Sequence, residues 1–107
     1  MGQHLLLDGV SRYELEPDDL GYFLEQCPRV IKMTVIRPAE IHRTAGGLCG
    51  LEIIASSHIS VHTQGQEVHA DIFSCMTFDV DLAVEFAVKA LALERWSKVV
   101  IQRGSVK

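Results

Sequence analysis

The sequence predicts an α+β fold, a two-layer sandwich in which a mostly antiparallel sheet carries two helices on one face. Two stretches have helical spacing, and about six stretches are rich in β-branched or alternating residues. They follow one another as strand, helix, four strands, helix, strand. The 107 residues suffice for one core. We therefore expect a single domain over residues 1–107.

Each helix has a recognisable start. Pro17-Asp18-Asp19 places proline and two acids in a first turn, where both are favoured, and the helix is expected to stop near Pro28. Asp79 is expected to cap the second helix. Both helices have one apolar face that can pack on a sheet, formed by Leu20, Phe23, Leu24 and Cys27 in the first and by Leu82, Val84, Phe86, Ala87, Ala90, Leu91 and Leu93 in the second.

The strands are bounded by turn residues. Gln64-Gly65-Gln66 reads as a tight hairpin turn, and residues 37–47 read as a loop that ends in Ala45-Gly46-Gly47. The expected strands are residues 3–10, 29–36, about 48–55, 58–63, 67–75 and 96–102. With both helices on one face, the other face of the sheet needs a cover, which predicts a homodimer.

Composition narrows the kinds of partner. The formal net charge of -4 argues against nucleic acid and against an anionic membrane surface. No apolar run reaches membrane-spanning length, and the N-terminal residues lack the basic start of a signal peptide. The odd count of three cysteines is typical of reduced thiols, so we expect a cytoplasmic protein.

The most informative segment is the strand that begins at Ser57. Strand alternation sends Ile59, Val61 and Thr63 to one face and His58, Ser60 and His62 to the other. In the next strand, His69, Asp71, Phe73 and Cys75 share a face. A hairpin between the two strands would bring His62 and Cys75 onto one polar face. Hydroxyl, imidazole and thiol groups close together are suited to nucleophilic and proton-transfer chemistry.

Taken singly, each of these residues also has an ordinary interpretation. A histidine in a strand is commonly a surface or interface residue, and a lone cysteine such as Cys49 or Cys75 is commonly a small buried apolar group. His58 and His62 are too far apart along a strand to share one metal ion, and no third ligand is evident. We therefore predict no metal site.

The combination of segments resembles the prokaryotic S-adenosylmethionine decarboxylase family over nearly the whole chain. The segments that carry the resemblance are, in order, Gly2-Gln3-His4-Leu5-Leu6, Gly47-Leu48-Cys49-Gly50, Ser57-His58-Ile59-Ser60-Val61-His62-Thr63, Ala70-Asp71-Ile72-Phe73-Ser74-Cys75 and Arg103-Gly104. The family implies an α/β sandwich that dimerises sheet to sheet, with a pyruvoyl cofactor made from the chain itself.

The resemblance also implies roles for single residues. Ser57 is similar to the serine that attacks the carbonyl of Ser56, so that the chain splits between them and residue 57 becomes the pyruvoyl group that condenses with the substrate amine. His62 resembles the histidine that assists this processing. Cys75 resembles the cysteine that returns a proton to the substrate carbon after carbon dioxide leaves.

The chain departs from the family pattern at three places. Ser56 replaces the usual glutamate before the processing serine, and Cys49 stands where a serine aids processing. After His62 the family usually reads Thr-Trp-Pro-Glu, with a glutamate that binds the substrate ribose. Here the segment is shorter, and Gln66 or Glu67 takes that place.

Three functions remain open on these residues. The first is decarboxylation of S-adenosylmethionine to supply the aminopropyl donor for spermidine synthesis. The second is pyruvoyl-dependent decarboxylation of arginine or ornithine, which the shortened segment at Gln66 and Glu67 motivates. The third is an unprocessed, non-catalytic homologue, which Ser56 and Cys49 motivate.

Overall fold

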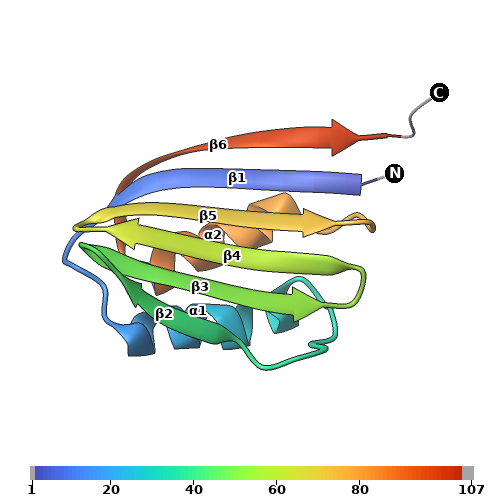
Figure 1. The fold of residues 1–107 in the computed structure, drawn as a ribbon. Coiled ribbons are helices and arrows are strands. Elements are labelled where there is room, and N and C mark those ends of the chain that lie inside the picture. The colour runs from blue at the N-terminus through green and yellow to red at the C-terminus, as the bar shows by residue number, and fades with distance from the viewer. Residues whose placement is uncertain (1, 105–107) are drawn as a thin grey trace.

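The six strands form one antiparallel sheet, and both helices lie against the same face of it (Figure 1). The computed structural model describes residues 2–104. The elements in chain order are β1 (Gly2–Ser11), α1 (Pro17–Val30), β2 (Glu40–Thr44), β3 (Gly47–Ile54), β4 (Ser57–Gln64), β5 (Glu67–Ser74), α2 (Val80–Ala90) and β6 (Leu93–Arg103). The predicted α+β sandwich is confirmed.

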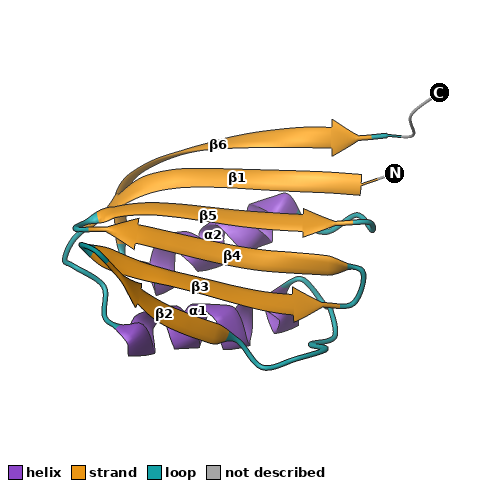
Figure 2. Cartoon of the chain, viewed as in Figure 1, coloured by secondary structure: helices purple, strands orange, loops and turns teal. Residues whose placement is uncertain are grey.

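The strand order across the sheet is β2-β3-β4-β5-β1-β6. Tight turns join β2 to β3, β3 to β4 and β4 to β5, while β1 lies between β5 and the last strand (Figure 2). The β3–β4 turn, the end of β5, the start of β1 and the end of β6 therefore lie along the same side of the sheet, where strands begin or end (Figure 1). The β4–β5 turn lies at the opposite ends of the strands.

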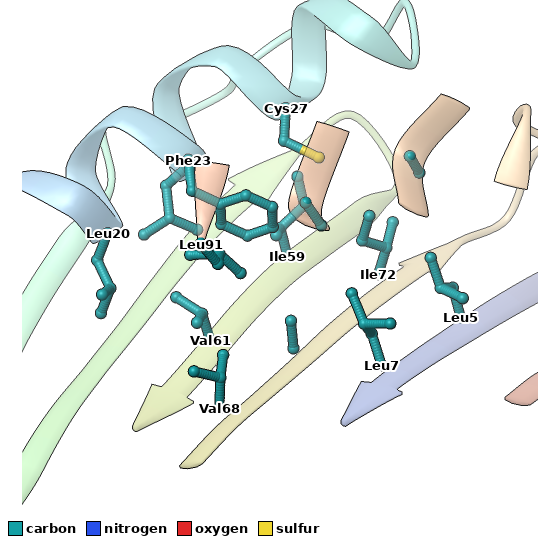
Figure 3. Close-up of a cluster of buried hydrophobic side chains, with 14 of the residues drawn as sticks. Leu5, Leu7, Leu20, Phe23, Cys27, Ile59, Val61, Val68, Ile72 and Leu91 are labelled. Carbon is teal, nitrogen blue, oxygen red and sulfur yellow. The ribbon is translucent and has the colours of Figure 1, made fainter. Parts of the chain in front are cut away.

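The core lies between the sheet and the two helices. Ile59, Val61 and Thr63 of β4 are buried, as strand alternation predicts. Leu20, Phe23 and Cys27 of α1 and Leu91, the C-cap of α2, close over Ile59 and Val61 (Figure 3). Each fully buried leucine, isoleucine or phenylalanine contributes roughly 1.5–3 kcal/mol relative to an exposed one. Both helices start as predicted, since Asp79 Oδ1 accepts the Leu82 N–H at 3.0 Å and Asp19 Oδ2 accepts the Glu16 N–H at 2.8 Å.

A glycine in β3 lets α1 lie close to the sheet. A Cβ added at Gly50 would lie 2.8 Å from Cδ1 of Leu24, which is closer than real Cβ contacts allow. At Gly47 an added Cβ would lie 1.8 Å from the backbone oxygen of Thr63. The glycines of the Gly47-Leu48-Cys49-Gly50 segment therefore have structural reasons to be there.

The predicted strand at residues 29–36 is wrong. Helix α1 continues through Pro28 to Val30, and Ile31 donates its N–H to the Cys27 carbonyl at 3.1 Å. Pro28 is in the last turn, so the helix loses little hydrogen bonding beyond it, and burial of Pro28 and Ile31 overrides the β propensity of this segment. The second strand lies instead inside the predicted loop, at β2.

Neither helix within residues 2–104 has the length and apolar character needed to cross a membrane.

Candidate active site

The face of the sheet that the helices leave uncovered, here called the open face, carries the polar side chains in rows across the strands. One row places His58 opposite Phe73 and Phe73 opposite His4. A second row, at the other end of the strands, places Cys49 opposite His62 and His62 opposite His69. The strand registers determine which residues stand opposite each other in each row. Because the two rows contain different side chains, the two ends of the open face differ chemically.

The first end contains the peptide bond between Ser56 and Ser57. Ser56 has a left-handed backbone, with φ of 55°, a conformation that costs a non-glycine residue roughly 1–2 kcal/mol. Its carbonyl oxygen accepts the N–H of Cys75 at 3.3 Å. This bond polarises the carbonyl that the Ser57 hydroxyl would have to attack.

Ser57 is the first residue of β4 and is 9% exposed. Its Oγ is buried, and within the described part of the chain it has no hydrogen-bond partner. Leaving a buried hydroxyl unsatisfied costs roughly 1–3 kcal/mol, so such an atom in a folded protein calls for an explanation. A buried hydroxyl that has no hydrogen-bond partner and belongs to the residue after the Ser56 carbonyl is available as a nucleophile.

The short segment after β5 holds Cys75 beside the Ser56–Ser57 peptide bond, here called the junction. Ser74 Oγ accepts the N–H of Met76 at 2.9 Å, and Gln3 Oε1 accepts the N–H of Phe78 at 3.1 Å. Together with the bond from Cys75 to Ser56, these fix the segment from both sides. Sequence reasoning missed Gln3 and Ser74, although both lie in segments that carried the family resemblance.

The three cysteines have different environments. Burial, with the nearby Glu52 carboxylate as a lesser cause, raises the pKa of the Cys27 thiol to about 12, so Cys27 is a core residue with an unreactive thiol. Cys75 is exposed at the junction, and Cys49 is half-buried at the far end of the open face. Cys75 is therefore the one thiol placed beside Ser57.

An aromatic cluster covers the open face next to the junction. The Phe73 ring lies 5.7 Å from the His58 ring and 5.8 Å from the His4 ring, measured between centroids. The Arg103 guanidinium lies 5.0 Å from the centre of the Phe73 ring. Flat apolar and cationic groups arranged this way suit the face of a planar ligand. The sequence pointed to His58 and Phe73 but assigned no role to His4 or Arg103.

The expected cluster of Ser57, His62 and Cys75 does not form within one chain. His62 lies on the open face, as predicted, but Cys75 follows the last residue of β5, so the two residues lie at opposite ends of the β4–β5 hairpin. Ser57 and His62 are five residues apart on one strand, which spans about 17 Å. Ser57 also points to the helix side, because it alternates in phase with the buried Ile59 and Val61.

The far end of the open face carries its own polar group. His69 Nδ1 and Asp8 Oδ1 are 2.6 Å apart, which ties β5 to β1 beside His62. Glu67 begins β5 on this same face and is exposed. Gln66 has a structural role instead, because its side-chain amide donates to the Ser11 carbonyl at 3.0 Å. Of the two residues proposed for the ribose, only Glu67 remains free to bind a ligand.

No group of three potential ligands within residues 2–104 is arranged to hold a metal ion. The one strongly perturbed carboxyl group, Glu52, is 3% exposed and lies on the helix side of β3. Burial, with the nearby Glu25 as a lesser cause, raises the pKa of Glu52 to about 7. Its position on the helix side separates it from the open face.

Comparison with known proteins identifies the family of the chain. Residues 4–104 match the family model described as S-adenosylmethionine decarboxylase. The fold resembles the crystal structure of the adenosylmethionine decarboxylase from Aquifex aeolicus VF5, with a TM-score of 0.80 and 26% sequence identity, over 100% of this chain and 93% of that chain. Among curated proteins, none matches this sequence. The chain belongs to the S-adenosylmethionine decarboxylase family.

Proposed function

We propose that the chain cleaves itself between Ser56 and Ser57 and then decarboxylates S-adenosylmethionine, which makes it the source of an aminopropyl donor for spermidine synthesis. The observation that carries this proposal is the junction itself. A buried, unpartnered Ser57 hydroxyl follows a strained Ser56 whose carbonyl accepts the Cys75 N–H. Membership of the decarboxylase family supports the reaction class.

The self-cleavage follows from these contacts. Ser57 Oγ attacks the Ser56 carbonyl carbon, the Cys75 N–H stabilises the negative charge that develops on the carbonyl oxygen, and the C–N bond breaks to leave an ester. Loss of the Ser57 α-proton then expels the Ser56 carboxylate. Addition of water and release of ammonia leave a pyruvoyl group at residue 57, and the chains 1–56 and 57–107 remain in one domain.

The residues around the junction fit the chemistry that follows. A pyruvoyl group at residue 57 supplies a carbonyl that condenses with the substrate amine and accepts the electron pair left by the departing carboxylate. The exposed Cys75 thiol holds a proton for the substrate carbon at the same place. The cluster of Phe73, His58 and Arg103 offers a surface for the planar adenine ring.

We further propose that the working unit is a homodimer in which two open faces pack together. The open face exposes Leu51, Ile53, Val99 and Ile101, a large apolar surface for a monomer. A two-fold axis that runs across the strands places the His62 end of one sheet over the Ser57 end of the other. The end of the sheet that holds the Ser56–Ser57 bond and Cys75 then lies over the partner's His62, whose counterpart in the same chain is about 17 Å from Ser57, and over the partner's Cys49 and Glu67.

Complementation between two defective chains tests this shared site. Expressed alone, Ser57→Ala and His62→Ala are each expected to stay uncleaved or to cleave slowly. Expressed together, they form dimers with one complete site, so the His62→Ala chain is expected to regain cleavage. Mass spectrometry distinguishes the two chains. Failure of the mixture to cleave, with mixed dimers present, would place the whole site in one chain.

Substrate choice is tested by carbon dioxide release. We expect S-adenosylmethionine to be consumed faster than arginine or ornithine, and Glu67→Gln to raise KM for it because a carboxylate can accept bonds from both ribose hydroxyls. Glu85→Gln, which changes an exposed glutamate on the helix side, is the matched control. Faster release from either amino acid, with Glu67→Gln neutral, would favour the second candidate function that the short β4–β5 turn suggests.

The same proposal places the protein in the cytoplasm, where three free cysteines stay reduced. Because a net charge of -4 argues against nucleic acid and an anionic membrane surface, we expect small molecules and a second copy of the chain as its partners.

A further inference from the structure

Strand β6 is a long edge strand with little protection. It spans 11 residues and pairs only with β1, whereas the opposite edge strand, β2, spans five. From Glu94 onward every residue of β6 is exposed. Four of them are large and apolar, namely Trp96, Val99, Val100 and Ile101, with exposed fractions of 45%, 56%, 38% and 44%. A long, apolar sheet edge is a template for another strand.

β6 is exposed on the helix side of the sheet as well as on the open face. Trp96 and Val100 are paired with Gly9 and Leu5, and the Leu5 side chain lies in the core, so these two residues face the helix layer. Helix α2 reaches β6 through the ion pair of Asp81 with Lys98, at 3.4 Å, but it leaves Val100 more than a third exposed. Packing of open faces in a dimer would therefore leave Val100 and the free backbone edge uncovered.

We propose that β6 pairs with β6 of a second copy of this chain, antiparallel and centred on Val100. In this register Val100 faces the partner's Val100, and Val99 faces the partner's Ile101. Lys98 faces the partner's Gln102, and Ser97 faces the partner's Arg103. The pairing covers residues 97–103 and joins the apolar side chains of two chains without placing like charges opposite each other.

Neighbouring registers are worse for electrostatic reasons. A centre at Lys98 places the two Lys98 side chains directly opposite each other, and a centre at Val99 places Arg95 opposite the partner's Arg103. Like charges directly opposite in a sheet are destabilising. A centre at Ile101 sets Val99 against the partner's Arg103. The sequence of the edge itself thus selects Val100 as the axis.

The pairing is compatible with the rest of the fold. Opposed residues of an antiparallel pair lie on the same face, so the helices of both copies stay on one side and the six-stranded sheet doubles in width. Trp96 falls opposite the partner's Gly104, which has no side chain and no atom within 4 Å of the site where one would be. Room for the indole is therefore available. Open-face dimers joined at this edge would contain four chains.

Variants that carry opposite charges at residue 100 test the proposed pairing of β6 with the partner's β6. Because Val100 faces itself, Val100→Lys and Val100→Glu are each expected to place two like charges in contact and to halve the particle mass seen by sedimentation at micromolar concentration. An equal mixture of the two variants is expected to restore the wild-type mass. Val100 is exposed, so neither change should unfold the chain, and circular dichroism checks this.

The matched control is the same pair of changes at Trp96, which lies on the same side of β6 as Val100. In the proposed register residue 96 faces the partner's Gly104, so each Trp96 variant should keep the wild-type mass and their mixture should change nothing. A mass that is halved by each Trp96 variant and restored by their mixture would overturn the register. A wild-type mass that is unchanged by both Val100 variants, or a wild-type monomer, would overturn the interface itself. Neither readout requires cleavage or decarboxylation.

Discussion

The Ser57→Ala variant is expected to remain one chain of 107 residues and to release no carbon dioxide from S-adenosylmethionine. Without Oγ, no atom is placed to attack the Ser56 carbonyl, so neither the ester nor the carbonyl group at residue 57 can form. The variant should fold at least as well as the wild type, because Ser57 Oγ is buried with no hydrogen-bond partner in residues 2–104. Mass spectrometry of the purified protein measures the result.

Ser60→Ala is the control for Ser57→Ala. Ser60 is on the same strand, but it lies on the open face opposite Asp71 and away from the junction. It is expected to cleave at the wild-type rate. Cleavage of Ser57→Ala at residue 57 would show that another group attacks the chain, and the assignment of Ser57 would be wrong.

Replacement of Cys75, the proposed proton donor, is expected to have the second largest effect. Cys75→Ala should lower decarboxylation by about 10²–10⁴-fold, the usual contribution of a general acid. Cleavage should continue, because the contact to the Ser56 carbonyl comes from the backbone N–H of residue 75, which alanine keeps. The measurement is the turnover of fully cleaved protein, together with the rate of cleavage.

Met76→Ala is the control for Cys75→Ala, since Met76 is the neighbouring exposed side chain at 66% exposure. It should leave turnover nearly unchanged. Wild-type turnover in Cys75→Ala would show that Cys75 is a surface thiol without a catalytic role. A loss of cleavage in Cys75→Ala would instead indicate that the side chain takes part in maturation.

Strand alternation was the strongest guide to the fold. It placed Ile59 and Val61 in the core and His58 and His62 on the opposite face, and the structure has the same arrangement. The alternation succeeds here because one face is buried, so a shift by one residue would expose the whole core side of the strand. The hairpin turn at Gly65 fixed the β4–β5 register from short-range sequence alone.

Long-range packing explains the elements that were misplaced. Residues 29–36 have high β propensity, but Pro28 in the last turn of α1 and Ile31 directly after it are buried, and tertiary burial outweighs a weak local preference. Strand β2 is short and mostly exposed, so it lacks the apolar alternation that identifies a strand. It forms because the adjacent β3 offers an unpaired edge.

The candidate site was predicted by residue type but not by geometry. Sequence similarity supplied Ser57, His62 and Cys75 as a set, and only the register of β4 and β5 revealed that His62 lies at the far end from the other two. Distance along a strand is fixed at about 3.3 Å per residue, so five residues cannot be brought together within one strand. That distance is the reason for proposing a site shared between two chains.

The intact mass of the purified wild-type protein shows whether Ser57 matures into a pyruvoyl group. We expect two chains, 1–56 and 57–107, with the second lighter by the mass of ammonia than a fragment that begins with serine. A protein that stays at the full-length mass of 11.9 kDa after prolonged incubation would contradict this expectation. So would a second fragment that begins with an unmodified serine, because simple hydrolysis leaves no carbonyl group at residue 57.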